Sequence, residues 1–188
     1  MSTFRFAIMG AGNIAHQFCD AVTLVEDCEV SAIASKDLGR AQKFAEECSV
    51  AHAYDNYEQM LIEEKPDCVY IAVTPNDHFR LTMLCLEHHV PVLCEKAMFT
   101  NSAEAKAVFE KAEKDQTFVM EAMWSRFLPA VNQAKKWAAE GKIGRLEALQ
   151  GRIGFLAPEG ADNRYHSPLL CGGAATDITV YAYEIATW

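Results

Sequence analysis

The first two-thirds of the chain alternates short apolar runs with longer segments in which apolar residues recur at helical spacing. This alternation is typical of β-strands separated by α-helices. Because strands joined through helices lie parallel, the pattern predicts a doubly wound α/β sheet with helices on both faces. The expected strands are residues 5–9, 30–34, 51–54, 68–73, 91–94 and 117–120.

After Glu121 the pattern changes, and two domains are expected, residues 1–121 and residues 122–188. The second segment predicts a helix ending near Gly141, a long strand over residues 145–156, and an apolar helix from Ala174 to the end of the chain. These elements cannot bury a core of their own. We therefore expect residues 122–188 to begin an incomplete α+β domain, within the front part of a longer protein.

Composition narrows the class of protein. Hydrophobic residues make up 51% and charged residues 23%, as in ordinary globular proteins, and no apolar run reaches the roughly 18 residues of a membrane span. The net charge of −9 disfavours a nucleic-acid partner, because phosphate binding needs a basic face. The seven cysteines form no C-x-x-C pair, which predicts reduced thiols, a cytoplasmic location and no metal site.

The stretch GAGNIA places Gly10, Gly12 and Ala15 in a G-x-G-x-x-A pattern between a predicted strand and a predicted helix. In dinucleotide-binding folds the first glycine permits a tight turn, and the second lets the backbone approach a pyrophosphate. The amides of Asn13 and Ile14 would then point at phosphate from the helix N-terminus. The pattern predicts a dinucleotide site in residues 1–121; the alternative is a tight turn with no ligand.

The end of the second strand favours NADP(H) over NAD(H), although NAD(H) stays possible. An NAD site usually has an acid here for the ribose 2′-hydroxyl, whereas a 2′-phosphate needs a cation. Ser35 and Lys36 occupy the place, Asp37 comes one residue late, and Arg40 lies one helical turn further on. The alternative is that Lys36 is a solvated loop lysine.

Two further groups follow predicted strands. Thr74, Pro75 and Asn76 come after the fourth strand and could line the nicotinamide side, or form a proline-based loop before a helix. Glu95 and Lys96 come directly after the fifth strand, at the carboxyl edge where such sheets bind ligands. A plain surface ion pair is the alternative for these two residues.

The segments GAGNIA, TPN, CEKA, MEAMWSRF and GGAATDITVY together resemble the Gfo/Idh/MocA oxidoreductases, especially the subgroup related to dimeric dihydrodiol dehydrogenase. The resemblance implies that Glu95 contacts the nicotinamide ribose and that Lys96 holds the substrate oxygen. It implies that Asp177 and Tyr181, one helical turn apart, complete the catalytic set.

The resemblance has further implications and some departures. Trp124 and Phe155 are similar to aromatic residues that line the subgroup's substrate pocket; ordinary packing between domains is the alternative. Ala97 stands where the family has a proline, and Thr179 stands where it has a glycine. The family often assembles as homo-oligomers through a second-domain sheet, which here would lie beyond Trp188.

The chemistry of these residue types fits an oxidoreductase. Hydride transfer at a carbon leaves charge on its oxygen, which needs a cation such as Lys96 and a proton donor such as Tyr181. Asp177 would orient the substrate and keep Lys96 protonated. We expect transfer between NADP(H) and a hydroxyl or carbonyl carbon of a small-molecule sugar, polyol or cyclic diol. The alternative is a regulatory module that binds the dinucleotide without turnover.

Overall fold

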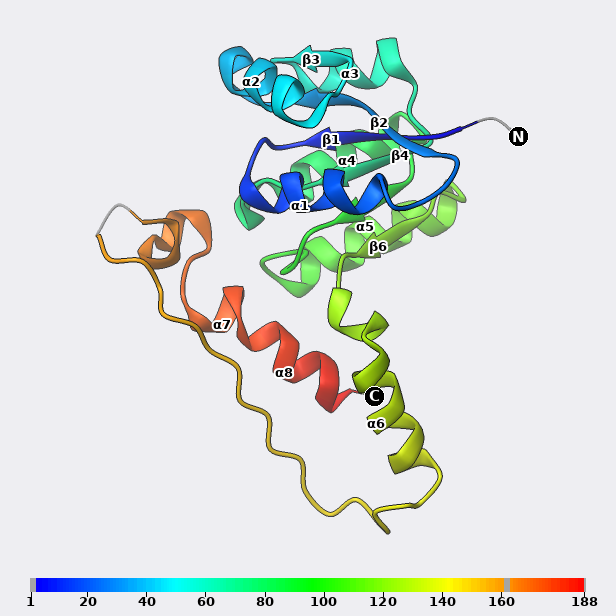
Figure 1. Cartoon of the computed structure of the whole chain (residues 1–188), viewed down its shortest axis with the longest axis vertical. Coiled ribbons are helices and arrows are strands. Elements are labelled where there is room, and N and C mark those ends of the chain that lie inside the picture. Colours follow the sequence, from blue (N-terminus) through cyan, green and yellow to red (C-terminus); the bar gives the residue numbers. More distant parts are fainter. Residues whose placement is uncertain (1–2, 161–162, 188) are drawn as a thin grey trace. The chain divides into compact units, whose positions relative to one another are not determined.

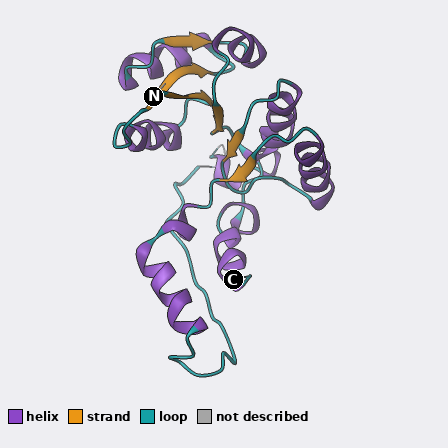
Figure 2. Ribbon diagram, turned by 90° about the vertical axis from the view of Figure 1, so that its right-hand side faces the viewer, coloured by secondary structure: helices purple, strands orange, loops and turns teal. Residues whose placement is uncertain are grey.

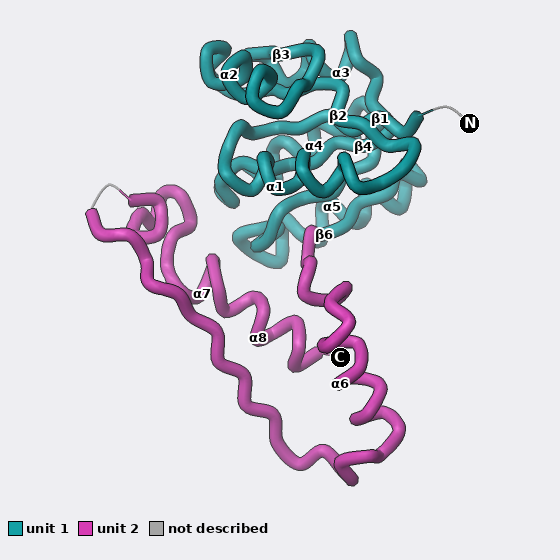
Figure 3. The backbone as a smooth tube through the Cα atoms, in the orientation of Figure 1, with its two compact units in different colours: residues 1–121 teal, residues 122–188 magenta. Residues whose placement is uncertain are grey.

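The computed structural model describes residues 3–160 and 163–187. The chain divides into two compact units, Met1–Glu121 and Ala122–Trp188 (Figure 3). The first unit contains a sheet, and the second is built from helices and long loops (Figure 1).

Unit 1 is one parallel sheet of six strands in the order β3-β2-β1-β4-β5-β6. The chain runs outward from β1 to β3 and then returns to β4, which pairs with the other side of β1. Ligands of such sheets bind beyond the carboxyl ends of the strands where the order reverses. The strands are β1 (Phe4–Met9), β2 (Cys28–Ala34), β3 (His52–Tyr54), β4 (Cys68–Ile71), β5 (Val92–Cys94) and β6 (Val119–Glu121).

Five helices connect these strands and lie on both sides of the sheet (Figure 2). The predicted alternation of strands and helices is therefore confirmed. Side-chain caps mark three helix starts: Asp37, Asn56 and Asn101 each accept a hydrogen bond from an amide three residues later. The helices are α1 (Asn13–Val22), α2 (Leu38–Cys48), α3 (Tyr57–Glu64), α4 (His78–Glu87) and α5 (Ser102–Lys114).

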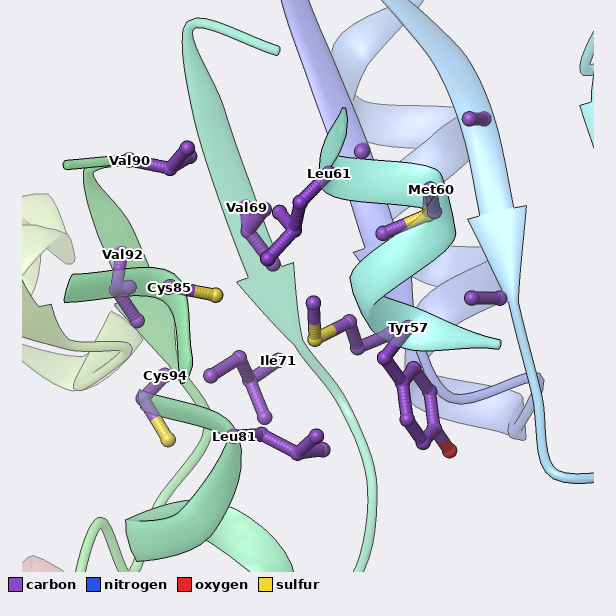
Figure 4. Close-up of a cluster of buried hydrophobic side chains, with 14 of the residues drawn as sticks. Tyr57, Met60, Leu61, Val69, Ile71, Leu81, Cys85, Val90, Val92 and Cys94 are labelled. Carbon is purple, nitrogen blue, oxygen red and sulfur yellow. The ribbon is translucent and has the colours of Figure 1, made fainter. Parts of the chain in front are cut away.

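Strand alternation divides the core between the two faces of the sheet. Ala7 and Met9 of β1 join a buried cluster with α3 and α4, in which Leu61 and Leu81 lie against the sheet (Figure 4). On the opposite face Tyr70 of β4 stacks on a residue of α1, Phe18, at a ring distance of 4.0 Å. Packing on both faces holds the carboxyl ends of β1, β4 and β5 in fixed register.

Unit 2 contains the helix α6 (Pro129–Ala139), which has no buried residue, and three short 3-10 helices. Those are η2 (Trp124–Phe127), η3 (Arg164–His166) and η4 (Pro168–Leu170). The strand predicted over residues 145–156 is wrong, since this segment runs as a loop. A strand needs a hydrogen-bonded neighbour, and the described part of unit 2 contains no second segment that pairs with it.

The predicted helix after Ala174 is present, but it is interrupted once. The structure has α7 (Ala174–Asp177) and α8 (Thr179–Ala186), interrupted at Ile178. The Thr179 hydroxyl donates to the Ala174 carbonyl oxygen at 2.7 Å, and such side-chain bonds to preceding carbonyls bend helices. Among all described residues, no helix combines the length and apolar character needed to cross a membrane.

Candidate active site

Gly10 makes the tight turn at the carboxyl end of β1. Its φ is +112°, and its amide donates to the Ala34 carbonyl oxygen of β2 at 2.8 Å. A Cβ atom at this position would lie 2.7 Å from the Ala72 carbonyl oxygen, closer than a side chain tolerates. Glycine is therefore required here by the fold itself.

Gly12 differs, because the protein leaves room for a side chain at this position. A Cβ atom there would meet only the Ala72 carbonyl oxygen, at 3.9 Å, and the backbone is extended. Gly12 is the N-cap of α1, and no side chain caps this helix in the described structure. The amides of Asn13 and Ile14 in the first turn thus have the arrangement that binds phosphate.

The residues predicted to choose the cofactor lie beyond β2. Ser35 is buried, and its amide donates to the Tyr54 carbonyl oxygen at 3.0 Å. Asp37 serves as the cap of α2, accepting from the Arg40 amide at 2.7 Å. The Arg40 guanidinium donates to the carbonyl oxygen of Ala11, inside the glycine turn, at 3.2 Å. The structure thus brings Arg40 to the glycine turn.

Lys36 is exposed and donates to the Asp77 carboxylate, a contact that the sequence did not predict. Asp77 ends the 3-10 helix η1 (Pro75–Asp77), for which Thr74 is the N-cap. Pro75 is buried in this turn, while Asn76 is exposed. The predicted TPN segment therefore lies at the carboxyl end of β4, as a short helical turn that leads into α4.

His78 joins the loop after β4 to the loop after β5, and the sequence assigned it no role. It is fully buried, with Nε2 3.1 Å from the Val73 carbonyl oxygen and Nδ1 3.0 Å from that of Ala97. Burial lowers the pKa of this imidazole, although the surrounding carbonyls act in the opposite direction. Its position directly after the TPN turn was the only sequence signal for it.

Glu95 is a buried carboxyl group held by residues of β4 and by the residue that follows it in the turn after β5. Its amide donates to the Ile71 carbonyl oxygen at 2.9 Å. The Tyr70 hydroxyl donates to Oε1 at 2.6 Å, and the Lys96 amide donates to Oε2 at 3.2 Å. Burial raises the pKa of Glu95, and these hydrogen bonds offset only part of the effect. Lys96 follows at once, half-buried on the turn after β5.

This raised pKa predicts a pH-dependent stability for a Glu95→Gln variant. The folded protein holds the Glu95 proton more tightly than the unfolded chain, where the pKa is near its ordinary 4.5. The protonated Glu95 side chain therefore stabilises the folded protein at pH values below the pKa of the unfolded chain. This stabilisation is lost as pH rises through the higher pKa that Glu95 has in the folded protein. Glutamine keeps an oxygen for Tyr70 and removes the charge, so the variant should gain stability relative to the wild type as pH rises to neutral.

Urea unfolding of both proteins at about pH 7.5 and about pH 4.5 measures this effect. The stability difference between variant and wild type should shrink at the lower pH, where wild-type Glu95 gains its proton. The same difference at both pH values would contradict the prediction.

In unit 2 the predicted residues form two contacts. The Trp124 indole nitrogen donates to the Tyr181 hydroxyl oxygen at 2.8 Å, and the two rings meet edge to face. Asp177 is buried, and Arg164 donates to it at 3.3 Å. The sequence did not identify this ion pair, because the two residues are separated by a loop and the glycine run.

Phe155 is connected to this ion pair through aromatic contacts. Its ring meets that of Tyr165 at 5.1 Å, and the Arg164 guanidinium lies 4.0 Å from the Tyr165 ring centre. None of the seven cysteines forms a disulfide, and the described residues contain no cluster of three His, Cys, Asp or Glu side chains that could hold a metal ion.

Residues 4–123 match the model of GFO_IDH_MocA, described as an oxidoreductase family with an NAD-binding Rossmann fold. The chain belongs to this family. The predicted resemblance is thus confirmed, and the turn after β1 of this Gfo/Idh/MocA protein is the glycine turn of a Rossmann fold.

Individual relatives of the Gfo/Idh/MocA chain include trans-1,2-dihydrobenzene-1,2-diol dehydrogenase of Mus musculus. The two are 33% identical over 185 residues, which are 96% of this chain and 54% of the mouse enzyme. The chain thus spans about half the length of the curated relatives that it matches.

Solved structures share the fold. An NAD-binding protein from Listeria innocua has a TM-score of 0.87 and 22% identity, covering 98% of this chain and 54% of its own. A 3-ketoreductase from Actinomadura kijaniata, in complex with TDP-benzene and NADP, has a TM-score of 0.71 and 26% identity. That likeness covers 77% of this Gfo/Idh/MocA chain and 44% of the ketoreductase.

Proposed function

We propose that the chain supplies the cofactor site and the catalytic residues of an NADP(H)-linked oxidoreductase. It would move hydride between the nicotinamide and a hydroxyl or carbonyl carbon of a sugar, polyol or cyclic diol. Residues 1–121 would bind the dinucleotide, and residues 122–188 would begin the substrate and oligomerisation domain. The observation that carries the proposal is the pairing, on one sheet edge, of the Gly10–Gly12 turn with Glu95 and Lys96.

The residues of unit 1 fit a dinucleotide. The room at Gly12 and the uncapped start of α1 support a pyrophosphate there, held by the amides of Asn13 and Ile14. Ser35, Lys36 and Arg40 would bind the adenosine ribose and its 2′-phosphate. Thr74, Pro75 and Asn76 would line the nicotinamide side, and Glu95 would contact the nicotinamide ribose.

Lys96, Asp177 and Tyr181 would carry the chemistry at the substrate. When bound, the nicotinamide supplies or accepts the hydride. The Lys96 ammonium would stabilise negative charge on the substrate oxygen, and Tyr181 would give or take the proton at that oxygen. Asp177 would orient the substrate and support the charged state of Lys96. Trp124 would hold the Tyr181 hydroxyl in place through its indole N–H, and Phe155 would line the pocket.

The substrate class rests on relatives. The diol dehydrogenase named above supports a small hydroxylated ring or polyol as the partner of this site. The proposed location is the cytoplasm, and the proposal includes neither a nucleic-acid nor a membrane partner. The proposed assembly is a homo-oligomer.

A two-step assay tests the proposed function. NADPH fluorescence is first titrated with the protein. NADPH oxidation is then followed with a panel of carbonyl compounds, which contains sugars and the oxidised forms of polyols and cyclic diols. Binding together with turnover supports the oxidoreductase. Binding without turnover on the whole panel supports the alternative, a regulatory dinucleotide-binding module. No fluorescence change with either NADPH or NADH contradicts both functions.

Cofactor choice gives a separate prediction for Lys36→Gln. Removing the cation should weaken NADPH binding by about tenfold, because a hydrogen bond to a charged group contributes about 1.5–3 kcal/mol, and should leave NADH binding nearly unchanged. Fluorescence titration with both cofactors measures the affinity ratio. Lys43→Gln, which removes an exposed lysine from α2, is the matched control. An unchanged ratio in Lys36→Gln would contradict the role of Lys36.

A further inference from the structure

An ion pair connects the loops that follow β2 and β4. Lys36 lies two residues beyond the end of β2, and Asp77 lies six residues beyond the end of β4. In the sheet, β1 lies between these two strands, with Met9 opposite both Ala34 and Ile71. The Lys36–Asp77 contact therefore spans the carboxyl end of β1, where the glycine turn begins.

Asp77 is the fixed member of this pair. Its side chain is 16% exposed, against 67% for Lys36. Burial acts to raise the pKa of Asp77, but hydrogen bonds and charges from Lys36 and Arg80 outweigh it and lower the pKa. The carboxylate is thus charged at neutral pH and cannot easily turn away.

Arg80 gives Asp77 a second partner. Its Nε lies 3.3 Å from Asp77 Oδ1, whereas Lys36 contacts the other oxygen. The Arg80 guanidinium is also 5.9 Å from the centre of the Tyr57 ring. Asp77 therefore stays paired when Lys36 leaves, and the long, exposed Lys36 side chain is the part that can move to a ligand.

From this arrangement we propose that Asp77 is a specificity-determining residue that shifts cofactor choice toward NADH. The inference rests on the proposed function, in which Lys36 binds the 2′-phosphate of NADPH. That phosphate and Asp77 are both anions competing for the same ammonium group. NADH carries a neutral 2′-hydroxyl, which does not compete for Lys36.

The charge balance around Lys36 supports the direction of the effect. Lys36 and Arg80 both contact the Asp77 carboxylate, whereas the Arg40 guanidinium donates to the Ala11 carbonyl oxygen. Asp37 is engaged as the cap of α2, so Asp77 is the carboxylate in contact with Lys36. Each additional anion beside a phosphate site repels the phosphate and lowers its affinity. The NADP(H) preference conferred by Lys36 is therefore reduced by Asp77.

The test is the ratio of NADPH to NADH affinity in Asp77→Asn, measured by fluorescence titration. The ratio should rise about fivefold, the size expected for a partly exposed ion pair. Asp77→Ser, which also removes the charge, should raise the ratio of NADPH to NADH affinity as well. Asp115→Asn, which breaks the 2.8 Å ion pair of Asp115 with Lys111 at the end of α5, is the matched control and should leave the ratio unchanged.

A double variant isolates the mechanism. In a Lys36→Gln background, Asp77→Asn should no longer change the ratio, because the shared cation is gone. An unchanged or lower ratio in folded Asp77→Asn and Asp77→Ser would overturn the inference while the proposed function stands. Failure of the wild type to bind either cofactor would overturn the proposed function and this inference together.

Discussion

Replacing Lys96 with methionine should lower turnover strongly while leaving dinucleotide binding almost intact. Methionine keeps a long aliphatic side chain but lacks the ammonium group that would stabilise charge on the substrate oxygen. Loss of one such donor typically lowers kcat by about 100- to 1000-fold. The measurement is kcat for NADPH oxidation with the best carbonyl substrate, beside the Kd for NADPH from fluorescence.

Urea unfolding of Lys96→Met beside the wild type separates this loss from a folding defect. The backbone amide of Lys96 donates to Glu95, and a side-chain replacement leaves that bond in place but removes the charge that lowers the pKa of Glu95. Lys106→Met removes an exposed lysine from α5 that pairs with Glu110, and it serves as the control. Lys96→Arg should retain part of the activity because it keeps the positive charge. Full activity in Lys96→Met would contradict the catalytic role of Lys96.

The sequence predicted the elements of unit 1 well because their signals are local. Apolar periodicity identified its alternating strands and helices. Gly10 was predicted for the same reason, since its positive φ belongs to a single turn. Such signals depend on residues that are neighbours in the sequence, and hardly on the order of the strands in the sheet.

Long-range contacts were missed because they depend on that order. Lys36 and Asp77 are separated by 41 residues and meet only because β2 and β4 both flank β1. Tyr70 reaches Glu95 across neighbouring strands, 25 residues apart. In unit 2, the apolar alternation over residues 145–156 is typical of a strand, but this segment runs as a loop. A strand needs a hydrogen-bonded neighbour, and the described part of unit 2 provides none.

Gly10 and Gly12 offer the sharpest separation of stability from binding. Gly10→Ala should destabilise the protein by about 3 kcal/mol or more, because it combines a positive φ with a backbone clash. The Cβ atom would lie 2.7 Å from the Ala72 carbonyl oxygen, and the backbone of a central strand cannot move aside cheaply. Thermal and urea unfolding measure this loss.

Gly12→Ala should instead leave stability within about 1 kcal/mol of wild type, because its Cβ has an ordinary 3.9 Å contact and an extended backbone. Dinucleotide affinity should fall about 10- to 100-fold, since a methyl group would occupy the space for the pyrophosphate and hydrogen bonds to charged groups contribute about 1.5–3 kcal/mol each. Gly154→Ala, whose Cβ would meet no atom within 4 Å, is the control for a harmless replacement. If Gly12→Ala bound both cofactors like the wild type, the pyrophosphate could not lie against this turn, because the backbone amides of α1 cannot reach a phosphate past the added methyl group.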